Sequence, residues 1–166
     1  MVEKIRKLSR SPFDLSIDVN ISNDPAEAAR SFDRFLALEA QRVKIAATYA
    51  EMNGFYINPG LWFCDFFAYA SYGGHDDYDW LSQWKSGESP RYPIRGMETL
   101  QAVYASARPR HGKKSDSDAE DMSDLLVVIK FQLFMKKAAT HMKSLCFPLL
   151  ITAHDFDFIA EVGPNV

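Results

Sequence analysis

The stretch LWFCDFFAYASY, residues 61–72, decides the expected fold because it is apolar at almost every position. Strands that are buried on both faces show such continuous runs, although a buried helix shows them too. Aromatic residues are dense in this run, Gly60 precedes it, and Gly73 and Gly74 follow it. These features favour a strand in the interior of a sheet.

Two further elements are predicted upstream of this run. Residues 13–21 alternate apolar and polar side chains strictly, which is the pattern of a half-buried strand. Residues 23–27 then supply a polar cap, a proline at the first helical position and an acid in the first turn. A long helix is therefore predicted from Pro25 to about Asn53. Its apolar stripe comprises Phe32, Phe35, Leu36, Val43, Ala46, Ala47 and Ala50.

Downstream of the run, the sequence predicts a short helix over 97–107 and a flexible loop over 108–116. A serine and a glutamate at 117–120 form a capping box, so a second long helix is expected to extend from there to about residue 144. Residues 149–162 are expected to form one bent strand or a tight hairpin. The fold class predicted is α+β: a small antiparallel or mixed sheet packed against two long helices and one short helix.

Length and composition predict one globular domain. The chain has 166 residues, of which 47% are hydrophobic and 25% charged, so it is long enough to bury a core and unlike a disordered chain. Its net charge of -3 gives no general attraction to nucleic acid or to anionic membranes, whereas a basic protein partner is permitted.

The two cysteines and the N-terminal residues predict the compartment. Cys64 and Cys146 have apolar neighbours, so both are expected to be buried thiols. Residues 1–10 are charged and lack an apolar core, and no apolar run approaches the roughly 20 residues of a membrane helix. A cytoplasmic protein without an anchor is expected.

The usual signatures of catalysis are missing from the sequence. It contains no GxSxG, GxxxxGK or GxGxxG motif and no paired CxxC motifs, so no catalytic residue and no cofactor is predicted. The basic run at 108–114 is followed at once by four acids between 116 and 121. Charge that cancels in this way is typical of a solvated loop and not of a nucleic-acid site.

Residues 72–80, YGGHDDYDW, are the strongest candidate for function, because acids and a histidine stand among glycines and aromatics. The spacing lacks the register of an EF-hand loop, so no metal site is predicted. His75 beside Asp76 or Asp77 permits a general base, yet adjacent residues seldom make the required contact. A simple solvated turn that leads into a short helix is a further interpretation, because Asp and Gly dominate turns.

The function predicted is a non-enzymatic protein-binding module that uses an acidic and aromatic surface. One form of it is a bacterial immunity protein that inhibits a cognate toxin. Aromatic side chains anchor interfaces and an acidic rim steers a basic partner. The predicted partner-binding residues are Tyr72, His75, Asp76, Asp77, Tyr78, Asp79, Trp80 and Trp84.

Two alternatives remain open at the level of sequence. A metal-dependent hydrolase would use His75, Asp76 and Asp77, with His154 and Asp155 as a second His-Asp pair. This hypothesis requires the two pairs to meet in space around a pocket. A self-associating domain would instead use the exposed aromatics as a homodimer interface.

Overall fold

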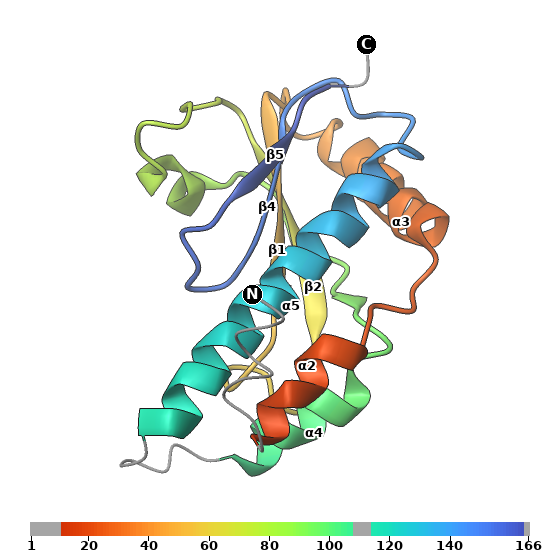
Figure 1. Cartoon of the computed structure of the whole chain (residues 1–166). Helices are drawn as coiled ribbons and strands as arrows, with labels where there is room; N and C mark the ends of the chain where they lie inside the picture. Colours follow the sequence, from red (N-terminus) through yellow and green to blue (C-terminus); the bar gives the residue numbers. More distant parts are fainter. Residues whose placement is uncertain (1–10, 108–113, 165–166) are drawn as a thin grey trace.

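A computed structural model describes residues 11–107 and 114–164, with residues 114–117 described as backbone only. The chain folds around one mixed sheet of five strands in the order β3-β2-β1-β4-β5, with helices packed beside it (Figure 1). The predicted α+β class is confirmed. The strands are β1 (Ala47–Asn53), β2 (Phe63–Tyr69), β3 (Tyr92–Pro93), β4 (Leu149–Ala153) and β5 (Ala160–Val162).

Strand β1 forms the centre of the sheet and pairs along its length on both sides. It runs antiparallel to β2, with Glu51 opposite Asp65, and parallel to β4, with Glu51 opposite Thr152. The backbone N–H and the hydroxyl of Thr48 both donate to the carbonyl of Pro148, at 2.9 and 3.2 Å. The central strand is thus joined to a strand about 100 residues later in the chain.

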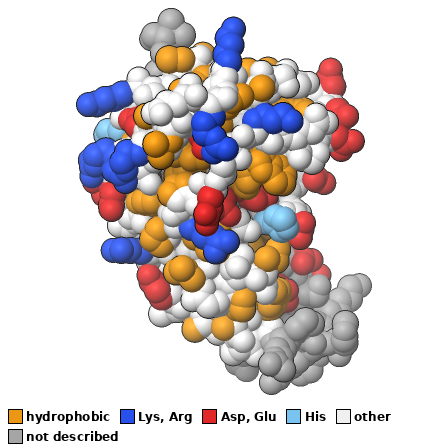
Figure 2. All heavy atoms as spheres, turned by 180° about the vertical axis from the view of Figure 1, so that it is seen from behind, with side chains coloured by type: hydrophobic (Ala, Val, Ile, Leu, Met, Phe, Trp, Pro, Cys, Tyr) orange, Lys and Arg blue, Asp and Glu red, His pale blue; other side chains and the backbone are white. Residues whose placement is uncertain are grey.

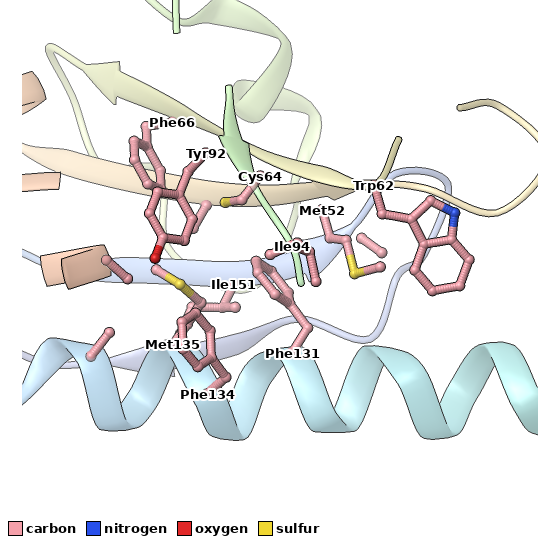
Figure 3. Packing of buried hydrophobic residues seen from close by; sticks show 14 of the residues in the cluster. Met52, Trp62, Cys64, Phe66, Tyr92, Ile94, Phe131, Phe134, Met135 and Ile151 are labelled. Atoms are coloured by element: carbon pink, nitrogen blue, oxygen red, sulfur yellow. The ribbon is translucent and has the colours of Figure 1, made fainter. Parts of the chain in front are cut away.

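Helices cover one face of the sheet and bury the main core there. The helices are α2 (Leu15–Asp18), α3 (Pro25–Glu39), α4 (Glu98–Ser106) and α5 (Lys114–Ala139), preceded by the 3-10 turn η1 (Pro12–Asp14). Met52, Cys64 and Ile151 point from the strands toward Phe131 and Met135 of α5 (Figure 3). All five of these side chains are fully buried.

Much of the second face of the sheet is covered by residues 70–91, here called the cover segment, and Ile159 also packs there. It contains the 3-10 turn η2 (Asp79–Gln83). Tyr49, Tyr69 and Leu150 of the sheet form a second, smaller apolar cluster with Trp80 and Leu81 of this segment. Strand β2 is therefore buried on both faces, which confirms the strand predicted within residues 61–72.

Two predicted elements are wrong. Residues 13–21 form η1, α2 and an extended stretch and not a strand. The side chain of Ser11 accepts a hydrogen bond from the N–H of Phe13 and so starts the first turn. Phe13 and Ser16 are then buried at helical spacing. The helix that begins at Pro25, with Asp24 as its cap, ends at Glu39 and not near residue 53. Residues 47–53 are β1, because they pair with β2 and β4.

The other predictions agree with the structure more closely. Helix α4 and the β4–β5 hairpin lie where they were expected. Helix α5 begins at Lys114, within the predicted loop 108–116, and residues 108–113 of that loop lie outside the described part of the chain. The helix ends at Ala139, before the predicted residue 144. The predicted capping serine at 117 has no described side chain.

Cys64 is buried, whereas Cys146 is exposed, so only one of the two thiols follows the prediction.

Candidate partner-binding surface

The cover segment is attached to the edge strand β5 through Glu161. The hydroxyl of Tyr72 donates to Oε2 of Glu161 at 2.8 Å, and Nε2 of His75 lies 3.2 Å from the same oxygen. The other ring nitrogen of His75 is 3.2 Å from the hydroxyl of Tyr78. Tyr72, His75 and Tyr78 are therefore joined to each other and to the sheet, and they hold the segment in place.

Trp80 fixes the segment to the sheet by packing. Its ring meets Tyr69 edge-on with centroids 4.9 Å apart and also meets Tyr72 at 5.6 Å. Its Nε1 donates to the carbonyl of Gly74 at 3.2 Å. A Cβ atom at Gly73 would lie 2.3 Å from the Trp80 ring, so a glycine is needed there for this approach. Trp80 is thus mainly a structural residue.

The remaining predicted residues are available to solvent. Asp76, Asp77 and Asp79 are exposed, and Oδ1 of Asp77 accepts the N–H of Asp79 at 2.8 Å, which starts η2. Trp84 is 49% exposed and rests edge-on against Phe67, with centroids 5.4 Å apart. Within the described residues, no lysine or arginine lies within 4.0 Å of these three carboxylates.

The charge distribution places acidity on the side of the cover segment. The η2 turn lies at the upper left in Figure 1, which becomes the upper right after the half turn to Figure 2. Acidic side chains gather along that upper right edge in Figure 2, while lysines and arginines lie mainly toward the opposite edge. The molecule therefore has an acidic side even though its net charge is only -3.

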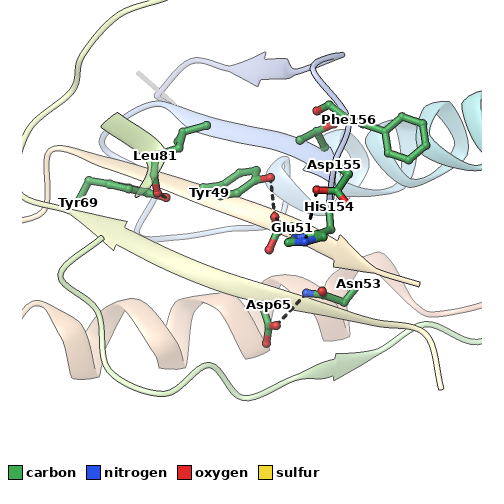
Figure 4. Close-up of polar contacts among 10 residues, drawn as sticks. Tyr49, Glu51, Asn53, Asp65, Tyr69, Leu81, His154, Asp155 and Phe156 are labelled. Carbon is green, nitrogen blue, oxygen red and sulfur yellow. Dashed lines mark hydrogen bonds and ion pairs between the residues drawn. The ribbon is translucent and has the colours of Figure 1, made fainter. Parts of the chain in front are cut away.

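A second polar group on the same sheet face was not predicted from the sequence. Glu51 and Asp65 stand directly opposite each other on β1 and β2 (Figure 4). Oε1 of Glu51 accepts from the hydroxyl of Tyr49 at 3.2 Å and lies 3.2 Å from Nδ1 of His154. Asp65 accepts from Nδ2 of Asn53 at 2.9 Å. Each acid therefore has its own hydrogen-bond partner, which offsets the repulsion between the two carboxylates.

Burial changes the titration of this group. It raises the pKa of Asp65, while a hydrogen bond from Ser89 and the charge of Arg91 act in the opposite direction. Burial also raises the pKa of Tyr49, and the neighbouring Glu51 adds to that effect. A signal for Asp65 does exist in the sequence, because it is the only charged residue in the apolar run 61–72. An isolated acid in a doubly buried strand needs a partner.

The two His-Asp pairs lie on the same side of the sheet but do not converge. His75 contacts Glu161, which pairs with Leu150, four residues before His154. Four residues along a strand correspond to about 13 Å. His154 contacts Glu51 instead, and its Nε2 is 3.5 Å from Asp155, which has a left-handed φ of 64°. Asp155 and Asp157 lie in the connection between β4 and β5 and not on a strand.

The described residues contain no group of three or more His, Cys, Asp or Glu side chains that could hold a metal ion. The geometry therefore gives no support to the metal-dependent hydrolase that the sequence left open. Among the same residues, no helix has the length and apolar character needed to cross a membrane. Comparisons of the chain with protein-family models, with curated proteins and with solved structures each return no match.

Proposed function

We propose that the chain is a protein-binding module whose contact surface is formed by Asp76, Asp77, Asp79 and Trp84, here called the acidic surface. The observation that supports this proposal most is that some side chains of the cover segment attach it to the sheet while others face solvent. Tyr72, His75 and Trp80 hold the segment through contacts within the fold, although Tyr72 and His75 are also exposed. The three acids and Trp84 are exposed on the backbone that these contacts anchor.

The chemistry of this surface suits a basic protein partner. The backbone beneath it is already ordered, so binding loses little conformational entropy. Among the described residues, no lysine or arginine forms an ion pair with the three carboxylates, so their charge can accelerate the encounter with a positively charged surface. The half-exposed Trp84 provides a hydrophobic anchor. An immunity protein that covers the active site of a cognate toxin needs these properties, and it is the specific form of the proposal.

The test is binding of a partner captured from the source cell, measured with wild type and with the triple variant Asp76→Asn/Asp77→Asn/Trp84→Ala. We expect at least a tenfold loss of affinity, because hot-spot aromatics and paired charges each contribute about 1 to 3 kcal/mol. Affinity for wild type is also expected to fall as salt rises.

A matched control removes two acids and one exposed apolar side chain elsewhere. Asp118, Asp121 and Leu133 are exposed on α5, which packs on the other face of the sheet. The variant Asp118→Asn/Asp121→Asn/Leu133→Ala is expected to bind like wild type. If the cover-segment variant binds every captured partner as tightly as this control does, the acidic surface is not the contact surface.

If a toxin-like reading frame lies next to the gene, its product is the first partner to examine. Co-expression with that toxin should restore growth with wild type and not with the triple variant. Light scattering across a concentration series separates this proposal from self-association. A mass that doubles with concentration, and no longer does so in the triple variant, would mean that the surface binds a second copy of the chain.

A further inference from the structure

A cavity of about 260 Å³ opens between α3 and residues 90–95, at the edge of the sheet away from β5. Glu27, Ser31 and Arg34 of α3 line one wall. Their spacing of four and three residues places them on one face of the helix. The cavity is independent of the acidic surface, none of whose residues lines it.

The opposite wall is held at a fixed distance from α3 by Asn23. The side-chain amide of Asn23 donates to the hydroxyl of Tyr92 at 3.2 Å and to the carbonyl of Pro93 at 3.0 Å. Its carbonyl oxygen accepts the N–H of Arg95 at 2.7 Å. Three bonds from one side chain thus tie the strand to the start of α3. The spacing of the two walls is therefore set by the fold, whereas Arg34 and Arg95 line the cavity as exposed side chains.

The lining includes hydrogen-bond donors from both walls. Tyr92 is only 6% exposed, and because its oxygen accepts from Asn23, its hydroxyl hydrogen remains to donate. Ser31 is 8% exposed and adds a second hydroxyl. Arg34 and Arg95 bring two guanidinium groups, which are the side chains best suited to bind carboxylate or phosphate groups.

Neither of these arginines has an acidic partner within 4.0 Å among the described residues. The contrast with other arginines is informative, because Arg30 lies 3.7 Å from Asp24 and Arg42 lies 3.4 Å from Glu39. Two arginines minus one glutamate leave the lining with a net charge of +1. A lining with this net positive charge attracts an anion.

We infer that this cavity binds a small oxyanion, a phosphate or carboxylate group, between Arg34 and Arg95, with the hydroxyls of Tyr92 and Ser31 as further donors. Cavities for drug-sized ligands begin at about 300 Å³, so the ligand is a small one. The exposed Glu27 carboxylate faces the same space and opposes an anion, which makes its removal informative.

The test is a titration of the whole chain with inorganic phosphate, and separately with acetate, against chloride at equal ionic strength. Amide NMR signals of residues 31–34 and 92–95 are followed. Saturable shifts are expected with at least one of the two oxyanions and not with chloride. Arg34→Gln and Arg95→Gln should each weaken binding about tenfold, the usual effect of losing one charge-assisted hydrogen bond. Comparison of phosphate with acetate shows which oxyanion is preferred.

Two further variants make the outcome decisive. Arg30→Gln removes an arginine that lies on the same helix but does not line the cavity, and it should leave binding unchanged. Glu27→Gln removes the opposing charge, and it should tighten binding about threefold. Absence of saturable shifts with both oxyanions, equal affinity in the two cavity arginine variants and wild type, or loss of binding in Glu27→Gln would each overturn the inference.

Discussion

Asp124 is an acid whose pKa the fold raises strongly. It lies on α5 opposite Tyr104 of α4, whose hydroxyl donates to its carboxylate and whose ring packs against Phe13 and Tyr56 with centroids 5.0 and 5.3 Å away. Burial raises the pKa of Asp124 to about 7, although the hydrogen bond from Tyr104 lowers it. The charges of two acids on the same helix add to the increase.

This raised pKa predicts a loss of stability with rising pH. The ordinary pKa is 3.8, so between about pH 4 and pH 7 the folded chain holds a proton at Asp124 that the unfolded chain has lost. The free energy of unfolding should therefore fall across that window and level off above it. The total is about 2 to 4 kcal/mol, since one pKa unit corresponds to about 1.4 kcal/mol and solvent reduces the full value.

Urea unfolding at a series of pH values checks this prediction. Asp124→Asn keeps the shape of the side chain and removes its titration, so the stability difference between the variant and wild type should change by that amount from pH 4 to pH 7.5. Asp118→Asn, at an exposed position of the same helix, should run parallel to wild type. Equal pH dependence in wild type and Asp124→Asn would contradict the proposed burial of a protonated acid.

At the scale of elements, Lys130 of α5 supports the short helix α2. Its ammonium group donates to the carbonyls of Ser16, Ile17 and Val19, which α2 leaves without helical partners at its end. Burial lowers the pKa of Lys130, while the charge of Asp18 acts against that change. A four-residue helix is otherwise too short to be stable by itself.

Lys130→Met retains most of the apolar stem and removes the three hydrogen bonds. We expect a loss of about 2 kcal/mol in the free energy of unfolding, because carbonyl groups that are half-buried lose their donor. Chemical denaturation measures this value directly. Lys136→Met, at an exposed position of the same helix, should change stability by less than about 0.5 kcal/mol. Equal values for the two variants would mean that the ammonium group does not hold α2.

The elements that sequence predicted correctly carry local signals. Asp24 and Pro25 start α3 as expected, and the doubly apolar run became β2. Strand β1 was missed because its alanines continue the helical spacing of α3, and no glycine or proline separates the two elements. What makes residues 47–53 a strand is pairing with β2 and with β4, and the β4 partner is distant in sequence. A local pattern cannot show such a partner.

The candidate site was predictable to a similar extent. Composition alone pointed to residues 72–84 as a site, which stays a prediction; the structure shows that the three acids and Trp84 there are exposed. The structural role of Trp80 was not evident, since its contact with Tyr69 requires the cover segment to fold back over the sheet. Glu51 was not predicted as part of a polar group for another reason, because the sequence placed it in the helix that was predicted to extend to about residue 53.

At the scale of the whole molecule, the sheet has two cores of unequal size. The helical face buries most of the apolar residues, whereas the second face depends on Tyr49, Tyr69 and Leu150 under Trp80 and Leu81. Hydrogen bonds between the cover segment and β2 are few. The N–H of Lys85 donates to the carbonyl of Ala68, the hydroxyls of Ser86 and Ser89 accept from N–H groups of the strand, and the hydroxyl of Tyr69 donates to the carbonyl of Leu81. So few contacts predict that the segment opens by itself.

Removing the Trp80 ring should therefore release the cover segment without unfolding the helical core. In Trp80→Ala, we expect the amides of Phe66, Ala68 and Lys85 to exchange at least tenfold faster, while amides of β1 that bond to β4 keep their protection until global unfolding. Native-state hydrogen exchange resolves the two groups. Trp84→Ala, which removes a half-exposed ring beside Phe67, should have a much smaller effect. If β1 and the cover segment lose protection together in Trp80→Ala, the two cores form one cooperative unit, and the acidic surface cannot move independently of the sheet.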